Sequence, residues 1–232
     1  MTVQSSRSIN KFPRIIELVG VAGTGKSTLL RAMRQRNERI KTLPLPSKIS
    51  YLSFLIKMAS TWLPLYLKNY RDSRWFTVQE IRNMGYLDTW LPFIRSQART
   101  REDIFALDTG SVHWLASLQE FGPPITRHPR YQGWLKNKHE QWSSALDVII
   151  WLEAPDDLCL ERVLSRDERH ELKHIPTESA LREEKCYRES YGQIIPSMAA
   201  QHSVKVLFFR TDQVSTQQMV DQIFSETDLN GN

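Results

Sequence analysis

A short glycine-rich segment carries the clearest chemistry in this sequence. Residues 20–28 read GVAGTGKST and directly follow the apolar run RIIELV at Arg14–Val19. The segment matches the pattern G-x-x-x-x-G-K-[ST] in full, with a predicted strand before it and a predicted helix after it. Its glycines let backbone amides turn inward around an anion, and a helix amino terminus adds a favourable dipole. The pattern therefore predicts a loop that binds the phosphates of a nucleotide.

Each polar residue of this loop has an expected role. Lys26 is expected to bridge the β- and γ-phosphates of ATP, and the Ser27 hydroxyl to ligate Mg²⁺. The sequence lacks an obvious guanine-reading N-K-x-D motif, which counts against GTP. The residues expected to bind the nucleotide are Gly20, Gly23, Thr24, Gly25, Lys26, Ser27 and Thr28.

An acidic residue follows another apolar run, IFAL at Ile104–Leu107. Asp108 then stands at the carboxyl end of a predicted strand, where neighbouring parallel strands place their ligand-binding loops. We expect Asp108 to hold magnesium or to orient the hydroxyl of a phosphoryl acceptor. The alternative is an ordinary turn residue, because Asp-Thr-Gly is good turn chemistry.

Three arginines follow the apolar strand VIIWL at Val148–Leu152. Arg162, Arg166 and Arg169 have the spacing i, i+4 and i+7, so one continuous helix would carry them on one face. Arginine suits the bidentate grip of phosphate oxygens and the stabilisation of a phosphoryl group in transfer. The alternative is a solvated helix face whose arginines pair with neighbouring carboxylates.

The elements that position these residues alternate between strand and helix. Candidate strands are Arg14–Val19, a weak one near Arg39–Leu43, Ile104–Leu107, Val148–Leu152 and Val204–Phe209. Helical patterns cover Lys26–Glu38, pieces within Ser47–Arg99, Val112–Glu120, Tyr131–Ala145, Asp156–Arg169, Thr177–Ala199 and Ser215–Phe224. This alternation predicts an α/β fold with a parallel sheet and helices on both faces. We expect one domain over residues 1–232.

The residues from about 44 to 102 contain no clear strand, so we expect a helical insertion over the acceptor site. Its most apolar stretch, Ile49–Leu67, is interrupted by Lys57 and Pro64 and is too weak for a membrane span. We expect a helical cover packed on the core; an interfacial helix and the wall of an apolar substrate pocket are the alternatives. Arg71 and Arg74 would grip an anion at the pocket mouth or lie on the surface.

The overall composition is that of an ordinary globular protein. The net charge is +5, from 31 Lys and Arg against 26 Asp and Glu, without a run of consecutive basic residues. This balance favours small anionic ligands over nucleic acid. The two cysteines, Cys159 and Cys186, fit a reducing, cytoplasmic location. We expect a small-molecule partner and no membrane partner, while pairing of two chains into a homodimer stays open.

The order of these parts resembles the P-loop nucleoside and nucleoside-monophosphate kinases, most nearly the thymidylate-kinase-like group. The resemblance rests on the phosphate loop, the Arg-bearing helix FIRSQAR, the strand ending in Asp108, the segment VIIWLEAP with LERVLSRDER, and the late YRESYGQII and VKVLFF. It implies a three-layer fold with a five-stranded sheet in the order 2-3-1-4-5. It also implies an arginine-rich lid over about 162–176 and an acceptor phosphate held by Arg95 or Arg99.

Two residues depart from the thymidylate-kinase pattern. Ala22 stands in the middle of the loop, where those enzymes usually carry an acidic residue, and Thr109 stands where an arginine usually follows the strand-end aspartate. The sequence therefore predicts an ATP- and Mg²⁺-dependent phosphotransferase whose acceptor is a nucleoside or nucleoside monophosphate. The alternatives are a P-loop ATPase switch that regulates a partner and a kinase for a sugar or lipid-like alcohol.

Overall fold

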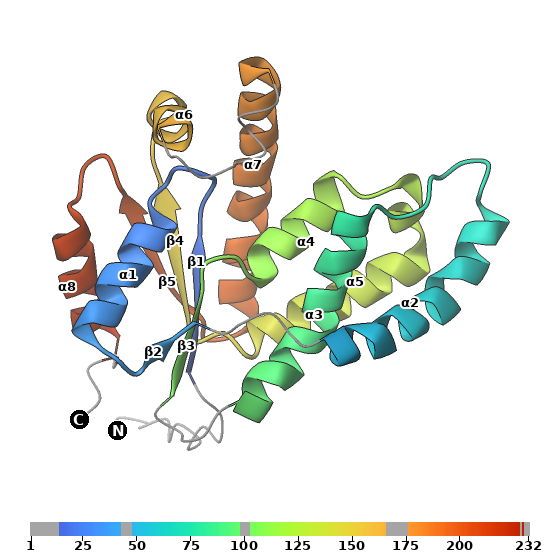
Figure 1. Cartoon of the computed structure of the whole chain (residues 1–232), viewed down its shortest axis with the longest axis horizontal. Coiled ribbons are helices and arrows are strands. Elements are labelled where there is room, and N and C mark those ends of the chain that lie inside the picture. Colours follow the sequence, from blue (N-terminus) through green and yellow to red (C-terminus); the bar gives the residue numbers. More distant parts are fainter. Residues whose placement is uncertain (1–13, 43–47, 98–102, 166–175, 228, 230–232) are drawn as a thin grey trace, which may run out of the picture.

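The computed structural model of the chain describes residues 14–42, 48–97, 103–165, 176–227 and 229. Five strands form one parallel sheet in the order β2-β3-β1-β4-β5, which confirms the predicted order (Figure 1). The strands are β1 (Arg14–Val19), β2 (Ile40–Lys41), β3 (Ile104–Leu107), β4 (Val148–Glu153) and β5 (Lys205–Arg210). Within the described residues the weak strand β2 has only two residues, and its expected end at Leu43 lies outside them.

Helices cover both faces of the sheet, as the alternation of elements predicts. They are α1 (Lys26–Arg36), α2 (Lys48–Lys68), α3 (Val78–Gln97), α4 (Ser111–Glu120), α5 (Pro129–Ser143), α6 (Asp156–Leu164), α7 (Thr177–Gln201) and α8 (Thr216–Glu226), with a 3-10 turn at Pro124–Arg127. None of the helices in the described part of the chain combines the length and apolarity that crossing a bilayer requires.

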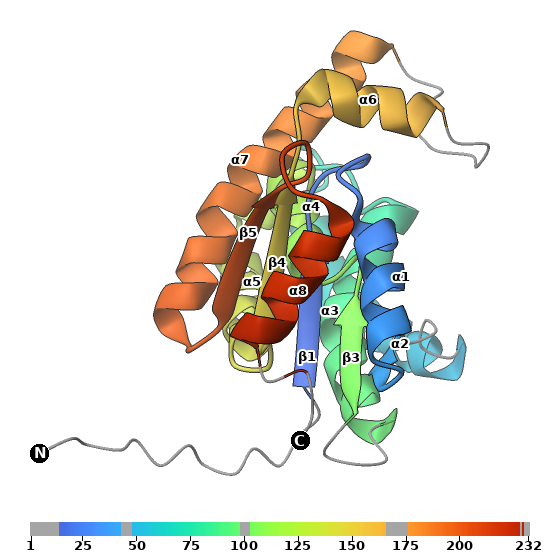
Figure 2. The ribbon, with the colours of Figure 1, turned by 90° about the vertical axis from the view of Figure 1, so that its left-hand side faces the viewer.

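Alternation along β1 divides the core into two layers. Ile16 and Leu18 face α1 and α8 in one hydrophobic cluster, while Ile15 and Val19 belong to a larger cluster on the opposite face. The larger cluster packs α4 and α7 on the sheet, and α3, α5 and α2 lie outside them (Figures 1 and 2). The three inner strands, β1, β3 and β4, are largely buried on both faces, which explains their nearly continuous apolar sequences.

The helical insertion consists of α2 and α3. Because β3 begins at the amino edge of the sheet, α3 must end near that edge and begin near the carboxyl edge. Residues at the start of α3 therefore lie close to the phosphate loop, and residues in its last turn lie far from it. This direction decides which insertion residues reach the candidate site.

One residue of β1 breaks the apolar pattern and determines where α4 begins. Glu17 is fully buried and accepts hydrogen bonds from the amides of Ser111 (3.0 Å) and Val112 (2.8 Å) and from the Ser111 hydroxyl (2.6 Å). The N-cap residue Gly110 has no side chain to do this. Glu17 thus caps α4 from another strand and fixes the turn between β3 and α4.

Gly110 is required by this contact. A Cβ at position 110 would lie 2.6 Å from the Glu17 carboxyl carbon and 2.9 Å from both of its oxygens. We expect Gly110→Ala to lower the free energy of unfolding by about 1–3 kcal/mol, because Glu17 cannot move without losing its donors. Chemical denaturation of the purified variant measures this loss.

Gly133→Ala is the matched control for this prediction. Gly133 lies in α5, and a Cβ there meets nothing within 4 Å. The control should gain up to about 1 kcal/mol from helix propensity. Equal stability of the Gly110→Ala variant and the wild type would contradict a rigid contact between Glu17 and the start of α4.

Candidate active site

The phosphate loop lies between β1 and α1, and hydrogen bonds between its own residues hold its conformation. The Lys26 ammonium donates to the carbonyl oxygens of Gly20 (2.5 Å) and Val21 (2.9 Å). The buried Thr24 hydroxyl donates to the same Val21 carbonyl at 2.8 Å, so its side chain shapes the loop. Gly23 has a φ of +82°, and a Cβ there would lie 2.2 Å from the carbonyl oxygen of Cys159. Only glycine fits this position.

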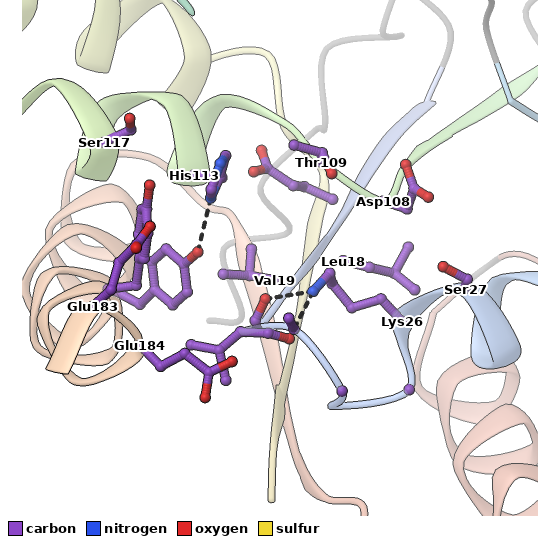
Figure 3. Close-up of a pocket in the computed structure, with 18 of the residues that line it drawn as sticks. Leu18, Val19, Lys26, Ser27, Asp108, Thr109, His113, Ser117, Glu183 and Glu184 are labelled. Carbon is purple, nitrogen blue, oxygen red and sulfur yellow. Dashed lines mark hydrogen bonds between the residues drawn. The ribbon is translucent and has the colours of Figure 1, made fainter. Parts of the chain in front are cut away.

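A cavity of about 390 Å³ opens beside the loop, a volume suited to a small-molecule ligand. Lys26 and Ser27 line one side of it, and Glu183 and Glu184 from α7 line the other (Figure 3). The loop and the acidic wall of α7 therefore face the same space. The remaining lining residues include Glu17, Gln79, Asp108, Thr109, His113, Ser117, Tyr187 and Tyr191.

Asp108 follows the carboxyl end of β3, as predicted, and lines this cavity with an exposed side chain. Ser27 is also exposed and lines the same cavity. No group of three or more His, Cys, Asp or Glu side chains suited to a metal occurs among the residues that the structure describes. One hydroxyl and one carboxylate nevertheless fit Mg²⁺, which usually keeps several waters and takes only one or two carboxylates from the protein.

Glu17 also lines the cavity while it holds the start of α4. Burial raises its pKa to about 7, although the amides of Ser111 and Val112 and the Ser111 hydroxyl favour the charged form. The same contact holds the turn that carries Asp108 and Thr109 next to the loop. Glu17 therefore positions Asp108 relative to Lys26.

A polar and aromatic group continues the cavity wall from α4 to α7. His113 Nδ1 lies 3.1 Å from the Tyr191 hydroxyl, and the His113 ring stacks on Tyr187 with a centroid distance of 4.9 Å (Figure 3). Burial and the nearby Lys26 charge lower the pKa of His113 to about 4. This histidine is therefore neutral near pH 7 and adds no positive charge to the cavity.

Glu184 is the most unusual side chain in the wall. It is only 4% exposed, and both carboxylate oxygens lack a hydrogen-bond partner among the described residues. Burial raises its pKa to about 7, while the charges of Arg188 and Lys26 lower it. A buried carboxylate without donors is costly unless a ligand supplies them. Glu184 is therefore a side chain of this cavity that could accept hydrogen bonds from a ligand.

The structure gives Arg162 a place next to the loop. Its guanidinium donates to the carbonyl of Gly23 (3.3 Å) and to the hydroxyl (3.1 Å) and carbonyl (3.4 Å) of Thr211. Helix α6 ends at Leu164, earlier than the expected Arg169. Arg166 and Arg169 lie outside the described residues, as does most of the expected lid, so a shared arginine face stays a prediction.

Three of the four arginines expected to hold an anionic acceptor do not line this cavity. Arg74 pairs with both oxygens of Glu80 (2.6 and 2.8 Å), and exposed Arg71 lies against Tyr70. Arg95 is exposed in the last turn of α3, the end that approaches the amino edge of the sheet. Arg99 lies outside the described residues.

Sequence patterns did not single out Gln79, His113, Glu17 or Glu184 as site residues. Gln79 lies in the first turn of α3 and reaches the cavity because that helix starts near the carboxyl edge. A signal did exist for Glu17, since a charged residue inside an apolar strand needs a partner. Glu184 carries no such signal, because it reads as one of many acidic residues on a long helix.

The pH dependence of stability tests the Glu17 contact. A carboxyl whose pKa rises from 4.5 to about 7 on folding takes up a proton in the native state, so stability falls as pH rises between these values. The titration of Glu17 lowers the free energy of unfolding by about 3 kcal/mol between pH 4.5 and pH 7. We expect Glu17→Gln to flatten this slope, measured by denaturant unfolding at a series of pH values.

Glu38→Gln, at an exposed position of the turn after α1, is the control and should keep the wild-type slope. Other groups around Glu17 do not mimic the effect. The pKa of His113 falls from 6.5 to about 4 on folding, so its contribution has the opposite sign and makes stability rise with pH in this range. The contributions of His113 and Glu184 are present in both variants, so the difference between their slopes reports Glu17. An unchanged slope in Glu17→Gln would show that Glu17 is ionised throughout this range.

Comparison with known proteins gives a similarity of fold. No family model matches the chain, and no curated protein matches it. The structure of deoxyadenosine kinase from M. mycoides with bound dATP superposes with a TM-score of 0.53 and 16% identity, covering 91% of this chain and 98% of that chain. The structure of that enzyme with bound dCTP gives a TM-score of 0.49 and 14% identity, covering 91% and 97%. The chain thus shares the α/β fold of deoxyadenosine kinase, with the sheet order 2-3-1-4-5.

Proposed function

We propose that this protein is an ATP- and Mg²⁺-dependent kinase that phosphorylates a hydroxyl group of an uncharged small molecule, with nucleosides as the acceptor class. The observation that carries the proposal is the charge of the shared cavity. Its described lining contains four acidic side chains, Glu17, Asp108, Glu183 and Glu184, and one cation, Lys26. The pKa of Glu17 and of Glu184 is about 7, so these two are partly protonated near neutral pH. The phosphate loop accounts for Lys26, which leaves the acceptor side acidic.

The acidic wall favours an uncharged acceptor over a nucleoside monophosphate. A phosphate monoester carries a charge of about −1.5 to −2 near pH 7, and carboxylates at short range repel it. No arginine among the described lining residues offsets this repulsion. Hydroxyl and amino groups, in contrast, donate hydrogen bonds to carboxylates. The rings of Tyr187 and His113 add a surface against which a planar base can pack.

The donor side follows from the loop. Lys26 would exchange its bonds to the Gly20 and Val21 carbonyls for the β- and γ-phosphates, while loop amides hold the remaining oxygens. Ser27 and Asp108 would hold magnesium, which neutralises charge on the phosphate oxygens when it is bound. Arg162 would keep the loop in place through Gly23.

Phosphoryl transfer to a hydroxyl group releases one proton, which a base of the protein must take up. The acceptor hydroxyl oxygen forms a bond to the γ-phosphorus as the bond from that phosphorus to the β–γ bridging oxygen breaks, and ADP leaves. The hydroxyl proton passes to the Glu184 carboxylate. Its pKa of about 7 and its lack of partners suit a general base near neutral pH. Catalysis otherwise consists of positioning and charge neutralisation.

An acceptor screen tests the reaction. ADP release should rise well above the basal rate with one or more nucleosides and stay basal with the matching monophosphates. Lys26→Ala should lower the stimulated rate at least a hundredfold, because it removes the charge that holds the transferred phosphate. Basal hydrolysis that no acceptor stimulates would favour an ATPase switch instead.

The role of Glu184 is tested separately. Glu184→Gln should lower kcat about a hundredfold or more with little change in the KM for ATP, because the base is lost and the loop is not. The wild-type kcat should rise with pH up to about pH 7, and the variant should lose this dependence. Glu189→Gln, at an exposed position five residues further along α7, is the control. Wild-type turnover in Glu184→Gln would remove Glu184 from the mechanism.

A further inference from the structure

Helix α2 is apolar on two opposite faces. Its inner face packs Phe54, Met58, Trp62 and Leu65 into the core, where each is less than 9% exposed. This packing confirms the expected helical cover. The outer face is also apolar, and the core does not account for it.

The exposed apolar residues fall on one line along the helix. Leu52, Ile56, Leu63 and Leu67 are 59%, 66%, 43% and 60% exposed, and Tyr70 in the next turn is 57% exposed. Their spacings of four, seven, four and three residues keep them on one side of a helix with 3.6 residues per turn. We call these five residues the outer stripe. An apolar patch of this kind marks an interaction site more often than chance exposure does.

The charges around the outer stripe are predominantly positive. The residues of α2 whose side chains are described include Lys57 and Lys68 and no Asp or Glu. Arg71 is exposed just beyond the helix, and one acidic residue, Asp72, follows it. Lys57 lies 3.3 Å from Asp88 of α3 and remains 70% exposed. A partner with negative charge and an apolar interior complements this surface.

A second copy of the chain fits the outer stripe less well. A helix of this length presents a strip of about 30 Å by 10 Å, so a symmetric pair would bury about 600 Å². Stable dimers bury about 1,200 Å² or more. Two copies of α2 would also bring together lysines without an acid on either helix. Both the area and the charge argue against α2 pairing with itself.

We propose that the outer stripe docks on the surface of an anionic lipid bilayer, with α2 lying along the interface. Apolar side chains would enter the boundary between headgroups and acyl chains, while Lys57, Lys68 and Arg71 meet anionic headgroups. Figure 1 shows α2 as the outermost helix on its side of the sheet, so docking there leaves the phosphate loop accessible. This proposal revises the expectation of no membrane partner and does not depend on the proposed reaction.

Vesicle sedimentation tests the proposal with the full chain. The wild type should sediment with vesicles of equal parts phosphatidylcholine and phosphatidylglycerol, and at least tenfold less with phosphatidylcholine alone. Ile56→Gln with Leu67→Gln should lower binding to the anionic vesicles at least tenfold. Lys68→Glu with Arg71→Glu should also lower binding to the anionic vesicles at least tenfold. Binding of this variant should depend less on the salt concentration than binding of the wild type does.

The control is Leu164→Gln with Phe208→Gln, which removes two exposed apolar side chains elsewhere, 53% and 49% exposed. It should bind like the wild type, and thermal melting should show that all variants are folded. Three outcomes would overturn the proposal. They are equal binding to both vesicle types, an equal loss in the control, and a wild-type dimer in solution that the stripe variant converts to monomer without any vesicle binding.

Discussion

The buried carboxylate of Glu17 ties together the two chain segments that form the candidate site. It lies in the central strand, three residues before the phosphate loop, and accepts three hydrogen bonds from the start of α4. The turn carrying Asp108 is therefore fixed relative to the loop carrying Lys26. Gly110 lacks a Cβ and so leaves room for the Glu17 carboxylate beside the start of α4. Without Glu17, the amino terminus of α4 would have no side chain to satisfy its amides, and the distance between the two segments would be set by packing alone.

The cavity beside the loop joins a general phosphate site to a particular acidic wall. In the proposed function, loop amides, Lys26 and Ser27 would serve any nucleoside triphosphate, so they carry little information about the acceptor. The acceptor is constrained by the opposite side, where α7 supplies carboxylates and α3 supplies Gln79. Under the proposed function, four acidic side chains against one lysine would select for acceptors that donate hydrogen bonds. The departure from the thymidylate-kinase pattern at Thr109 agrees with this wall, since the expected arginine is missing there.

Much of the fold could be predicted from the sequence because strands and helices leave different periodic patterns. Apolar runs located four strands, a weaker pattern located β2, and the glycine-rich loop identified the edge of the sheet that carries the cavity. Helix ends were less well predicted. The sequence pattern predicted a helix to Arg169, but α6 ends at Leu164, and no residue in the periodic pattern signals that end. The arginines expected at the acceptor site illustrate the harder problem. Residue type suggested a phosphate grip, but Arg74 pairs with Glu80, and the direction of α3 places Arg95 away from the cavity.

The sequence by itself therefore determined the sheet, the phosphate loop and the strand-end Asp108, because each depends on neighbours in the chain. The tertiary structure alone decided the acceptor side. Glu17 contacts residues more than ninety positions away, and Glu184 reaches the cavity from α7, which follows the phosphate loop by about 150 residues. Such contacts depend on how helices are directed and packed over the sheet. Local propensity and residue spacing do not predict how helices pack over the sheet. The acidic side chains of α7 opposite Lys26 were therefore recognised only from the tertiary structure.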